Sequence, residues 1–150
     1  MLGDIYTEMG YFERALKAYH HLLRLNPENA NCYTYLGYLL WQMDRNDEAV
    51  VAYQKALELN RDNPVAYNNL GVIYLDEKCQ LEQALQLFEE AVLLRPDYTL
   101  ACFNSARTLE GLGRTAEAAK RYSEALKMNS CNQEVAEHEI QERLARLFDV

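Results

Sequence analysis

The sequence predicts an all-α fold built from repeated helical hairpins. Sequence landmarks recur about every 34 residues, and the apolar residues between them lie three or four positions apart, as on one face of an α-helix. No segment carries a strand signal. With 150 residues, of which 49% are hydrophobic, the chain is long enough for one sizeable core and too short for most multidomain enzymes. We therefore expect a single domain over residues 1–150.

The repeat is clearest in the middle of the chain. Leu36-Gly37 recurs 34 residues later as Leu70-Gly71, whereas the landmarks farther along recur after 35 residues. One residue is therefore inserted between Tyr74 and Ala84. In the two middle repeats the later landmarks are Ala49, Tyr53 and Ala56, and then Ala84, Phe88 and Ala91. The preceding repeat has Ala15 and Tyr19, and the following repeat has Leu109, Ala118, Tyr122 and Ala125.

These landmarks divide the chain into five segments. A shortened repeat over residues 1–29 precedes complete repeats over 30–63, 64–98 and 99–132, and residues 133–150 lack the landmarks. The shortened repeat begins inside its first helix. We interpret the chain as a segment of a longer protein, with a natural start and a short first helix as the alternative.

Each complete repeat is expected to form two helices that pack through small residues. Counting from the first residue of a repeat, positions 4, 7, 8 and 11 form one stripe of the first helix, and positions 20, 24, 27 and 28 form one stripe of the second. Gly37 and Gly71 are small where two helix backbones approach closely, and Tyr53 and Phe88 fill the space beside them. Replacing Gly37 with leucine should therefore overpack the pair.

The expected helix ends carry the appropriate signals. Asn63-Pro64 supplies an N-cap followed by proline at the first helical position, and Gly10 and Gly113 suit the turns between helices. Pro27 and Pro96 should end the second helices. Residues 133–150 are expected to form a capping helix on the last repeat, with four apolar residues at helical spacing: Ala136, Ile140, Leu144 and Leu147.

The order Leu-Gly, aromatic, Ala, aromatic, Ala and terminal Pro resembles the tetratricopeptide repeat over residues 1–132. This resemblance implies that the hairpins stack into a right-handed superhelical solenoid with a C-terminal capping helix. It also implies that the first helices line a concave groove in which a protein partner binds.

Charge and hydropathy exclude several classes of partner. Fifteen Lys and Arg against 23 Asp and Glu give a net charge of −8, which would repel nucleic acids and anionic membrane surfaces. No apolar run approaches the roughly 20 residues that span a bilayer. The opening residues lack the basic and apolar pattern of an export signal. We therefore expect a cytoplasmic protein that neither binds nucleic acid nor inserts into membranes.

The reactive side chains do not predict catalysis, a metal site or a cofactor. His20 and His21 are adjacent on one expected helix and His138 lies in the expected cap, so they cannot converge on one pocket. The cysteines form no Cys-x-x-Cys pair and have no histidine at ligand spacing. We expect no enzymatic activity, no metal, no cofactor, and four free thiols: Cys32, Cys79, Cys102 and Cys131.

The resemblance places positions 2, 5, 6, 9, 12 and 13 of the first helices in the groove. There they hold more apolar and aromatic residues than an unused surface normally exposes. Tyrosine and tryptophan are frequent in binding hot spots, and carboxamides can bond a peptide backbone. The alternative is that these residues pack within the repeats. The predicted peptide-binding residues are Thr34, Tyr35, Tyr38, Trp41, Asn68, Asn69, Val72, Leu75, Phe103, Asn104 and Arg107, and the same positions include Asp4, Thr7, Glu8, Gln42 and Val65.

Two subclasses of the family can be compared with these positions. Members that hold the carboxylate of a chaperone peptide have Lys, Asn, Asn, Lys and Arg where this sequence has Thr34, Tyr38, Asn69, Leu100 and Asn104. Only Asn69 matches, so binding of that kind is not expected. Asn69 and Asn104 are similar to the asparagine ladder of glycosyltransferase-associated repeats, although Tyr35 interrupts it.

The sequence therefore predicts a non-enzymatic interaction module that binds a peptide or helical segment of a partner protein. Alanine at Tyr38 or Phe103 should weaken that binding with little change in melting temperature. One alternative is the substrate-recruiting segment of a larger enzyme, such as a glycosyltransferase. Another is a self-assembling scaffold, in which the exposed side of the first hairpin stacks on a second copy. We expect a monomer or weak self-association.

Overall fold

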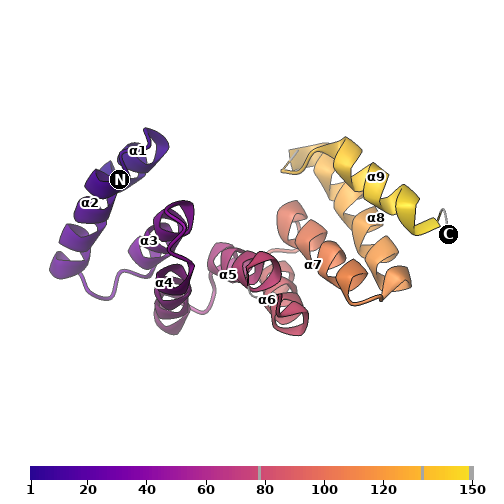
Figure 1. Ribbon diagram of the computed structural model, residues 1–150, viewed down its shortest axis with the longest axis horizontal. Helices are drawn as coiled ribbons and strands as arrows, with labels where there is room; N and C mark the ends of the chain where they lie inside the picture. Colours follow the sequence, from indigo (N-terminus) through magenta and orange to yellow (C-terminus); the bar gives the residue numbers. More distant parts are fainter. Residues whose placement is uncertain (78, 133, 149–150) are drawn as a thin grey trace. The chain divides into compact units, whose positions relative to one another are not determined.

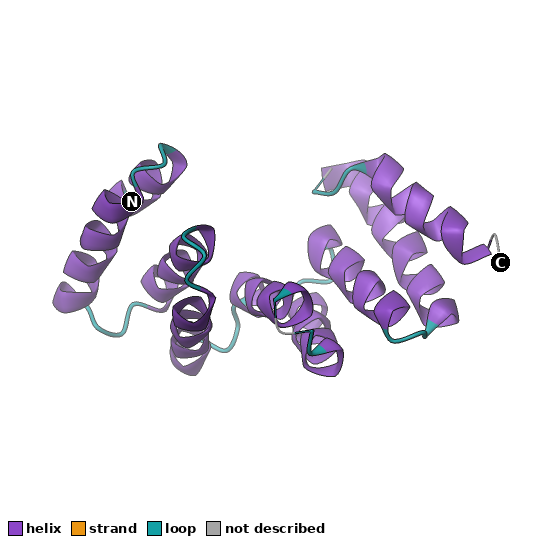
Figure 2. Ribbon diagram, in the orientation of Figure 1, coloured by secondary structure: helices purple, strands orange, loops and turns teal. Residues whose placement is uncertain are grey.

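The computed structural model describes residues 1–77, 79–132 and 134–148, without the side chains of residues 130–132. These residues form helices joined by turns, and no strand occurs among them (Figure 2). The all-α prediction is confirmed. The helices are α1 (Leu2–Glu8), α2 (Phe12–Leu25), α3 (Ala30–Gln42), α4 (Asn46–Leu59), α5 (Pro64–Asp76), α6 (Leu81–Leu94), α7 (Thr99–Gly111), α8 (Thr115–Asn132) and α9 (Glu137–Phe148).

The chain divides into two compact units. Unit 1, Met1–Leu70, contains α1 to α4 and the start of α5, and unit 2, Gly71–Val150, contains the rest of α5 and α6 to α9 (Figure 1). In unit 1, α1 packs on α2, α2 on α3 and α3 on α4. In unit 2, α6 packs on α7, α7 on α8 and α8 on α9. Each unit is therefore a stack in which helices adjacent in sequence are neighbours in space.

The second helix of each hairpin supplies the aromatic part of the core. A methyl group built on Gly37 would lie 2.8 Å from the ring of Tyr53, and one built on Gly71 would lie 2.7 Å from the ring of Phe88. These approaches confirm that the glycine of a first helix makes room for the ring of a second helix. The landmark residues of the second helices are almost completely buried: Ala15, Tyr19, Ala49, Tyr53, Ala56, Ala84, Phe88, Ala91, Ala118, Tyr122 and Ala125.

The turns within the hairpins share one backbone feature. Gly10, Asp44, Cys79 and Gly113 have φ angles of 74°, 60°, 50° and 73°. This left-handed conformation favours glycine because it has no Cβ, so the predicted turn role of Gly10 and Gly113 is confirmed. The four positions are 34, 35 and 34 residues apart, and the inserted residue therefore lies before Cys79 and leaves the turn conformation in place.

The predicted helix ends are also found. Asn63 Oδ1 accepts a hydrogen bond from Ala66 N at 3.0 Å, and α5 begins at Pro64, as an N-cap followed by proline requires. The second helices α2 and α6 end shortly before Pro27 and Pro96. Local sequence signals therefore determine where these helices begin and end.

Helix α9 covers the last hairpin of unit 2. Ile140 is completely buried in the core of this unit, and Leu144 and Leu147 pack against it. The prediction for Ala136 was wrong, because Ala136 is exposed and precedes α9. Val135 is buried instead, since Asn129 holds its backbone by two hydrogen bonds, from Asn129 Nδ2 to Val135 O at 2.7 Å and from Val135 N to Asn129 Oδ1 at 3.0 Å.

Three of the four cysteines have described side chains, and all three are free thiols. Cys32 and Cys102 are buried, whereas Cys79 is exposed. Burial raises the pKa of Cys32 to about 11 and that of Cys102 to about 11, so both thiols stay protonated at neutral pH. The side chain of Cys131 lies outside the described residues.

Candidate functional site

The candidate site lies on the first helices of unit 1. Tyr35, Tyr38 and Trp41 of α3 have exposed fractions of 44%, 40% and 38%. The ring centroids of Tyr38 and Trp41 are 5.9 Å apart, and Gln42 Nε2 donates to the hydroxyl of Tyr38 at 2.7 Å. Residues three and four apart share one face of a helix, and the opposite side of α3 is buried, so these side chains are displayed together.

A cavity of about 290 Å³ opens beside these rings, and we call it the Tyr38 cavity. Its residues come from α1, α2, α3 and the first turns of α5, so four elements of unit 1 position it. Its volume is close to the lower end of the range found for ligand pockets, roughly 300–1,000 Å³. The lining residues are Asp4, Thr7, Glu8, Tyr19, Thr34, Tyr35, Tyr38, Val65 and Asn69.

Hydrogen bonds fix the inner side of the Tyr38 cavity. The hydroxyl of Tyr19 donates to Asp4 Oδ1 at 2.7 Å, and burial raises the pKa of Tyr19, so the hydroxyl remains protonated. Thr34 Oγ1 accepts from Asn63 Nδ2 at 2.9 Å, which ties α3 to the N-cap of α5. The polar groups of Asp4, Tyr19 and Thr34 beneath the exposed rings therefore already have hydrogen-bond partners. They do not require a ligand to supply them.

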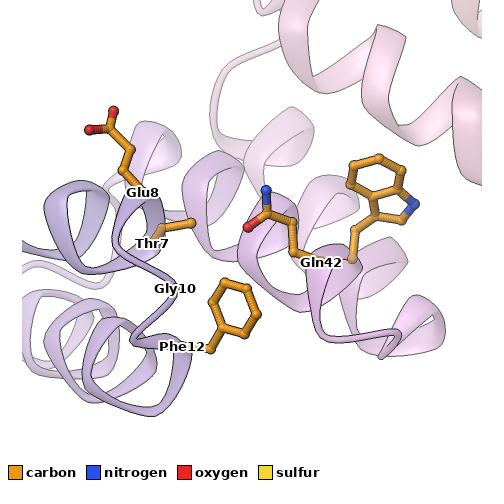
Figure 3. Close-up of a pocket in the computed structure, with 6 residues that line it drawn as sticks. Thr7, Glu8, Gly10, Phe12 and Gln42 are labelled. Atoms are coloured by element: carbon orange, nitrogen blue, oxygen red, sulfur yellow. The ribbon is translucent and has the colours of Figure 1, made fainter.

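A second cavity, of about 480 Å³, adjoins the first, and we call it the Phe12 cavity. It shares Thr7 and Glu8 with the Tyr38 cavity. Figure 3 shows Phe12 and Gln42 turned toward the same space, whereas the carboxylate of Glu8 extends outward from α1. The lining residues are Thr7, Glu8, Gly10, Phe12, Trp41 and Gln42.

Asn69 is partly exposed and lines the Tyr38 cavity. Its Oδ1 accepts from Asn68 Nδ2 at 3.1 Å, and its own amide nitrogen donates to none of the described residues. Asn69 can therefore donate a hydrogen bond to a ligand. The expectation of open positions was wrong for Thr34 and Asn68, which are buried: Thr34 is engaged by Asn63, and Asn68 by Asn69.

Unit 2 contains the remaining predicted residues. Val72, Leu75 and Arg107 are partly buried. Arg107 Nη2 donates to Asp76 Oδ1 at 3.1 Å and Arg107 Nη1 to Asn104 Oδ1 at 3.4 Å. The guanidinium is therefore engaged inside unit 2, which limits its use as a contact for a partner.

Phe103 and Asn104 are not open to a partner, contrary to the expectation. Phe103 is only 4% exposed, its ring centroid lies 5.7 Å from that of Tyr122, and the guanidinium of Arg143 lies 5.8 Å from it. The physical reason is α9, which brings Ile140 and Arg143 onto this face of α7. Asn104 is also buried. Both belong to the packing of unit 2.

Sequence reasoning missed Phe12 and Tyr19 as lining residues. Phe12 is the first residue of a second helix, whereas the predicted groove positions all lie on first helices. A large aromatic residue directly after a turn could have indicated that it lines a cavity. Tyr19 was recognised as a core landmark, and it also lines the Tyr38 cavity. Such a contact depends on neighbouring helices and has no sequence pattern.

Two further features of the described residues bear on other functions. No three His, Cys, Asp or Glu side chains in the described part of the chain are grouped closely enough to hold a metal ion. Among the described helices, none combines the length and apolar character needed to cross a membrane.

Comparisons with known proteins agree with the repeat. A model described as TPR repeat matches residues 3–44 and 42–78, and a model described as tetratricopeptide repeat matches residues 64–98. No curated protein matches the sequence. The family matches therefore cover the shortened repeat and the next two repeats.

Solved structures extend the likeness to most of the chain. A crystal structure of MamA has a TM-score of 0.80 at 26% identity, covering 89% of this chain and 78% of that one. A structure of Pseudomonas aeruginosa PilF has a TM-score of 0.85 at 23% identity, with 98% and 64% covered. The first TPR of Spaghetti (RPAP3), bound to the HSP90 peptide SRMEEVD, has a TM-score of 0.72 at 24% identity, with 79% and 90% covered. These structures share the all-α repeat fold, a solenoid of helical hairpins.

Proposed function

Because the chain belongs to the tetratricopeptide repeat family, we propose that it is a non-enzymatic interaction module that binds a peptide or helical segment of a partner protein. The exposure of Tyr35, Tyr38 and Trp41 beside two adjoining cavities carries this proposal. Clustered exposed aromatic residues are typical of interaction sites and are rare on surfaces that remain free. The proposed binding face therefore comprises the Tyr38 cavity and the Phe12 cavity.

The chemistry of this face fits a polypeptide. Burial of the three rings contributes roughly 25 cal/mol for each Å² removed from water, before the costs of ordering are subtracted. Aromatic side chains also have few torsions to immobilise on binding. The amide nitrogen of Asn69 supplies a donor for a backbone carbonyl of the ligand.

The acidic HSP90 peptide bound by the first TPR of Spaghetti is not the proposed ligand class. Thr34 and Tyr38 stand where the carboxylate-binding members have Lys and Asn. Thr34 is buried, and neither cavity is lined by Lys or Arg. A terminal carboxylate would therefore find no cation in either cavity of unit 1.

Replacing Tyr38 with alanine is expected to weaken a partner by about 1 to 3 kcal/mol while leaving the melting temperature nearly unchanged. The reason is that the Tyr38 ring is exposed and lines a cavity rather than the core. The partner is first isolated as a protein captured by the wild-type chain and lost from a Tyr38, Trp41, Asn69 triple-alanine variant. Calorimetric titration of that partner into wild type and Tyr38→Ala then gives the change in affinity.

Val51→Ala is the matched control, because Val51 is exposed on α4 and lines neither cavity. It should bind the partner as the wild type does. Equal affinity for the wild type and Tyr38→Ala would reject the proposed face. A parallel loss of folding, detected by circular dichroism, would show that Tyr38 supports the core instead.

Self-assembly is a second candidate function, supported by the outer side of α1. Leu2, Ile5 and Met9 follow helical spacing there, and all three are exposed. A second copy that stacked on this side would cover them. If this function is correct, light scattering should show a molar mass that falls on dilution, and Ile5→Lys should abolish the larger species. A constant monomer at all concentrations would exclude it.

A further inference from the structure

The first helices of unit 1 lack basic side chains, whereas its second helices carry charges of both signs. Helix α1, helix α3 and the part of α5 within unit 1 contain Asp4 and Glu8 but no Lys, Arg or His. The second helices hold cations beside acids: Arg14, Lys17 and Arg24 with Glu13 on α2, and Lys55 with Asp47, Glu48 and Glu58 on α4. The first helices, which carry the exposed rings, are therefore acidic and aromatic without a balancing cation of their own.

Glu8 is the acidic residue that is available on the proposed binding face. It is exposed, it lines both cavities, and it makes no ion pair or hydrogen bond with the described residues. Asp4 differs, because its Oδ1 accepts from Tyr19 and its Oδ2 from the amino group of Met1 at 2.5 Å. Glu8 thus borders both the Tyr38 cavity and the Phe12 cavity, and its unpaired carboxylate extends outward from α1 (Figure 3).

This arrangement suits a cation flanked by apolar groups. A guanidinium or ammonium group near Glu8 would gain a charge partner, and the faces of exposed tyrosine rings also attract cations. Tyr35 and Tyr38 line one of the two cavities that Glu8 borders, and Phe12 and Trp41 line the other. Large apolar side chains on either side of the cation could then enter the two cavities.

We propose that the binding face of unit 1 recognises a peptide segment in which an Arg or Lys stands between two large apolar side chains, with the cation at Glu8. This inference rests on the proposed function and specifies the class of its ligand. It predicts a ligand of opposite charge to the acidic tail of a chaperone. Long-range attraction between a basic segment and this chain of net charge −8 would also favour their encounter.

A phage-displayed library of random dodecapeptides, selected on the intact chain, tests the proposal. The selected sequences are expected to contain Arg or Lys between large apolar residues. A synthetic peptide of the selected sequence should bind about fivefold more tightly than the same peptide with Gln in place of the cation, measured by fluorescence anisotropy at about 0.05 M salt. The difference should diminish at about 0.5 M salt, where exposed charges are screened.

Glu8→Gln should remove the preference for the cation, and Glu28→Gln should retain it. Glu28 is the matched control because it is an exposed acid of unit 1 that lines neither cavity. Circular dichroism should show all these variants folded, because the exposed Glu8 side chain makes no hydrogen bond or ion pair with the described residues. A preference for the cation that persists in Glu8→Gln would overturn the assignment.

The remaining outcomes separate this inference from the proposed function. Selected peptides without a basic residue that still lose affinity for Tyr38→Ala would overturn the inference and leave the proposed function standing. Peptides that bind the wild type and Tyr38→Ala equally would count against both, because the ligand would then lie elsewhere. Failure to select any peptide would also count against both.

Discussion

Replacing Phe103 with alanine is expected to lower the free energy of unfolding by about 3 to 5 kcal/mol, as for other buried phenylalanines. Phe103 is 4% exposed and packs in one cluster with Tyr122 and Ile140. The truncation would leave a void between α7, α8 and α9 and would remove the ring beneath the Arg143 guanidinium. Urea unfolding followed by far-ultraviolet circular dichroism measures the change. The fluorescence of Trp41 would be a poor probe, because Trp41 belongs to unit 1.

Tyr38→Ala provides the contrast for this prediction. Its ring is 40% exposed, so we expect its loss to cost less than about 1 kcal/mol of stability. Equal unfolding midpoints for Phe103→Ala and the wild type would show that α9 does not cover Phe103 on α7 in solution. Phe103 would then return to the set of candidate binding residues.

The two substitutions also indicate what the sequence could predict. Second-helix residues such as Tyr53, Phe88 and Tyr122 were recognised as core because each recurs with small residues at helical spacing and in several repeats. The turn glycines, the N-cap at Asn63 and the capping helix followed from equally local signals. Repetition made the second-helix predictions reliable, because each repeat provided an independent copy of the same pattern.

The binding face was less predictable because it depends on neighbouring helices. Position 5 of the complete repeats, occupied by Thr34, Asn68 and Phe103, lies outside the core stripe of its own helix and is nevertheless buried. Asn63 engages Thr34, and α9 covers Phe103. A helical wheel contains only the residues of one helix, so it cannot show which positions an adjacent element covers.

The acidic character of the face could have been found in the sequence. The first helices of unit 1 lack Lys, Arg and His, and this can be counted once the helices are placed. Its significance depends on Glu8 lying beside both cavities, and that placement requires the hairpins to be folded. Composition therefore indicates the sign of the charge, while the structure indicates where the charge is available.

The final prediction concerns Gly37, where helix propensity and packing predict effects of opposite sign. Leucine is a better helix former than glycine by roughly 0.8 kcal/mol, so propensity alone predicts that Gly37→Leu stabilises α3. Packing predicts a net loss of about 1 to 3 kcal/mol, because even a methyl group at this position would lie 2.8 Å from the ring of Tyr53. Tyr53 is completely buried, so a shift of its ring would have to displace its neighbours in a close-packed core.

Thermal unfolding followed by the fluorescence of Trp41, which lies on the same helix as Gly37, decides between the two effects. Gly37→Ala should be destabilising to a smaller degree than Gly37→Leu. Gly111→Ala, which lies in unit 2 and is therefore followed by circular dichroism, is the control, since its methyl group would lie 3.3 Å from the end of the Leu81 side chain, which can move. If Gly37→Leu melts at or above the wild-type temperature, Gly37 does not provide the space that the Tyr53 ring occupies. The repeat register on which both cavities are built would then be wrong.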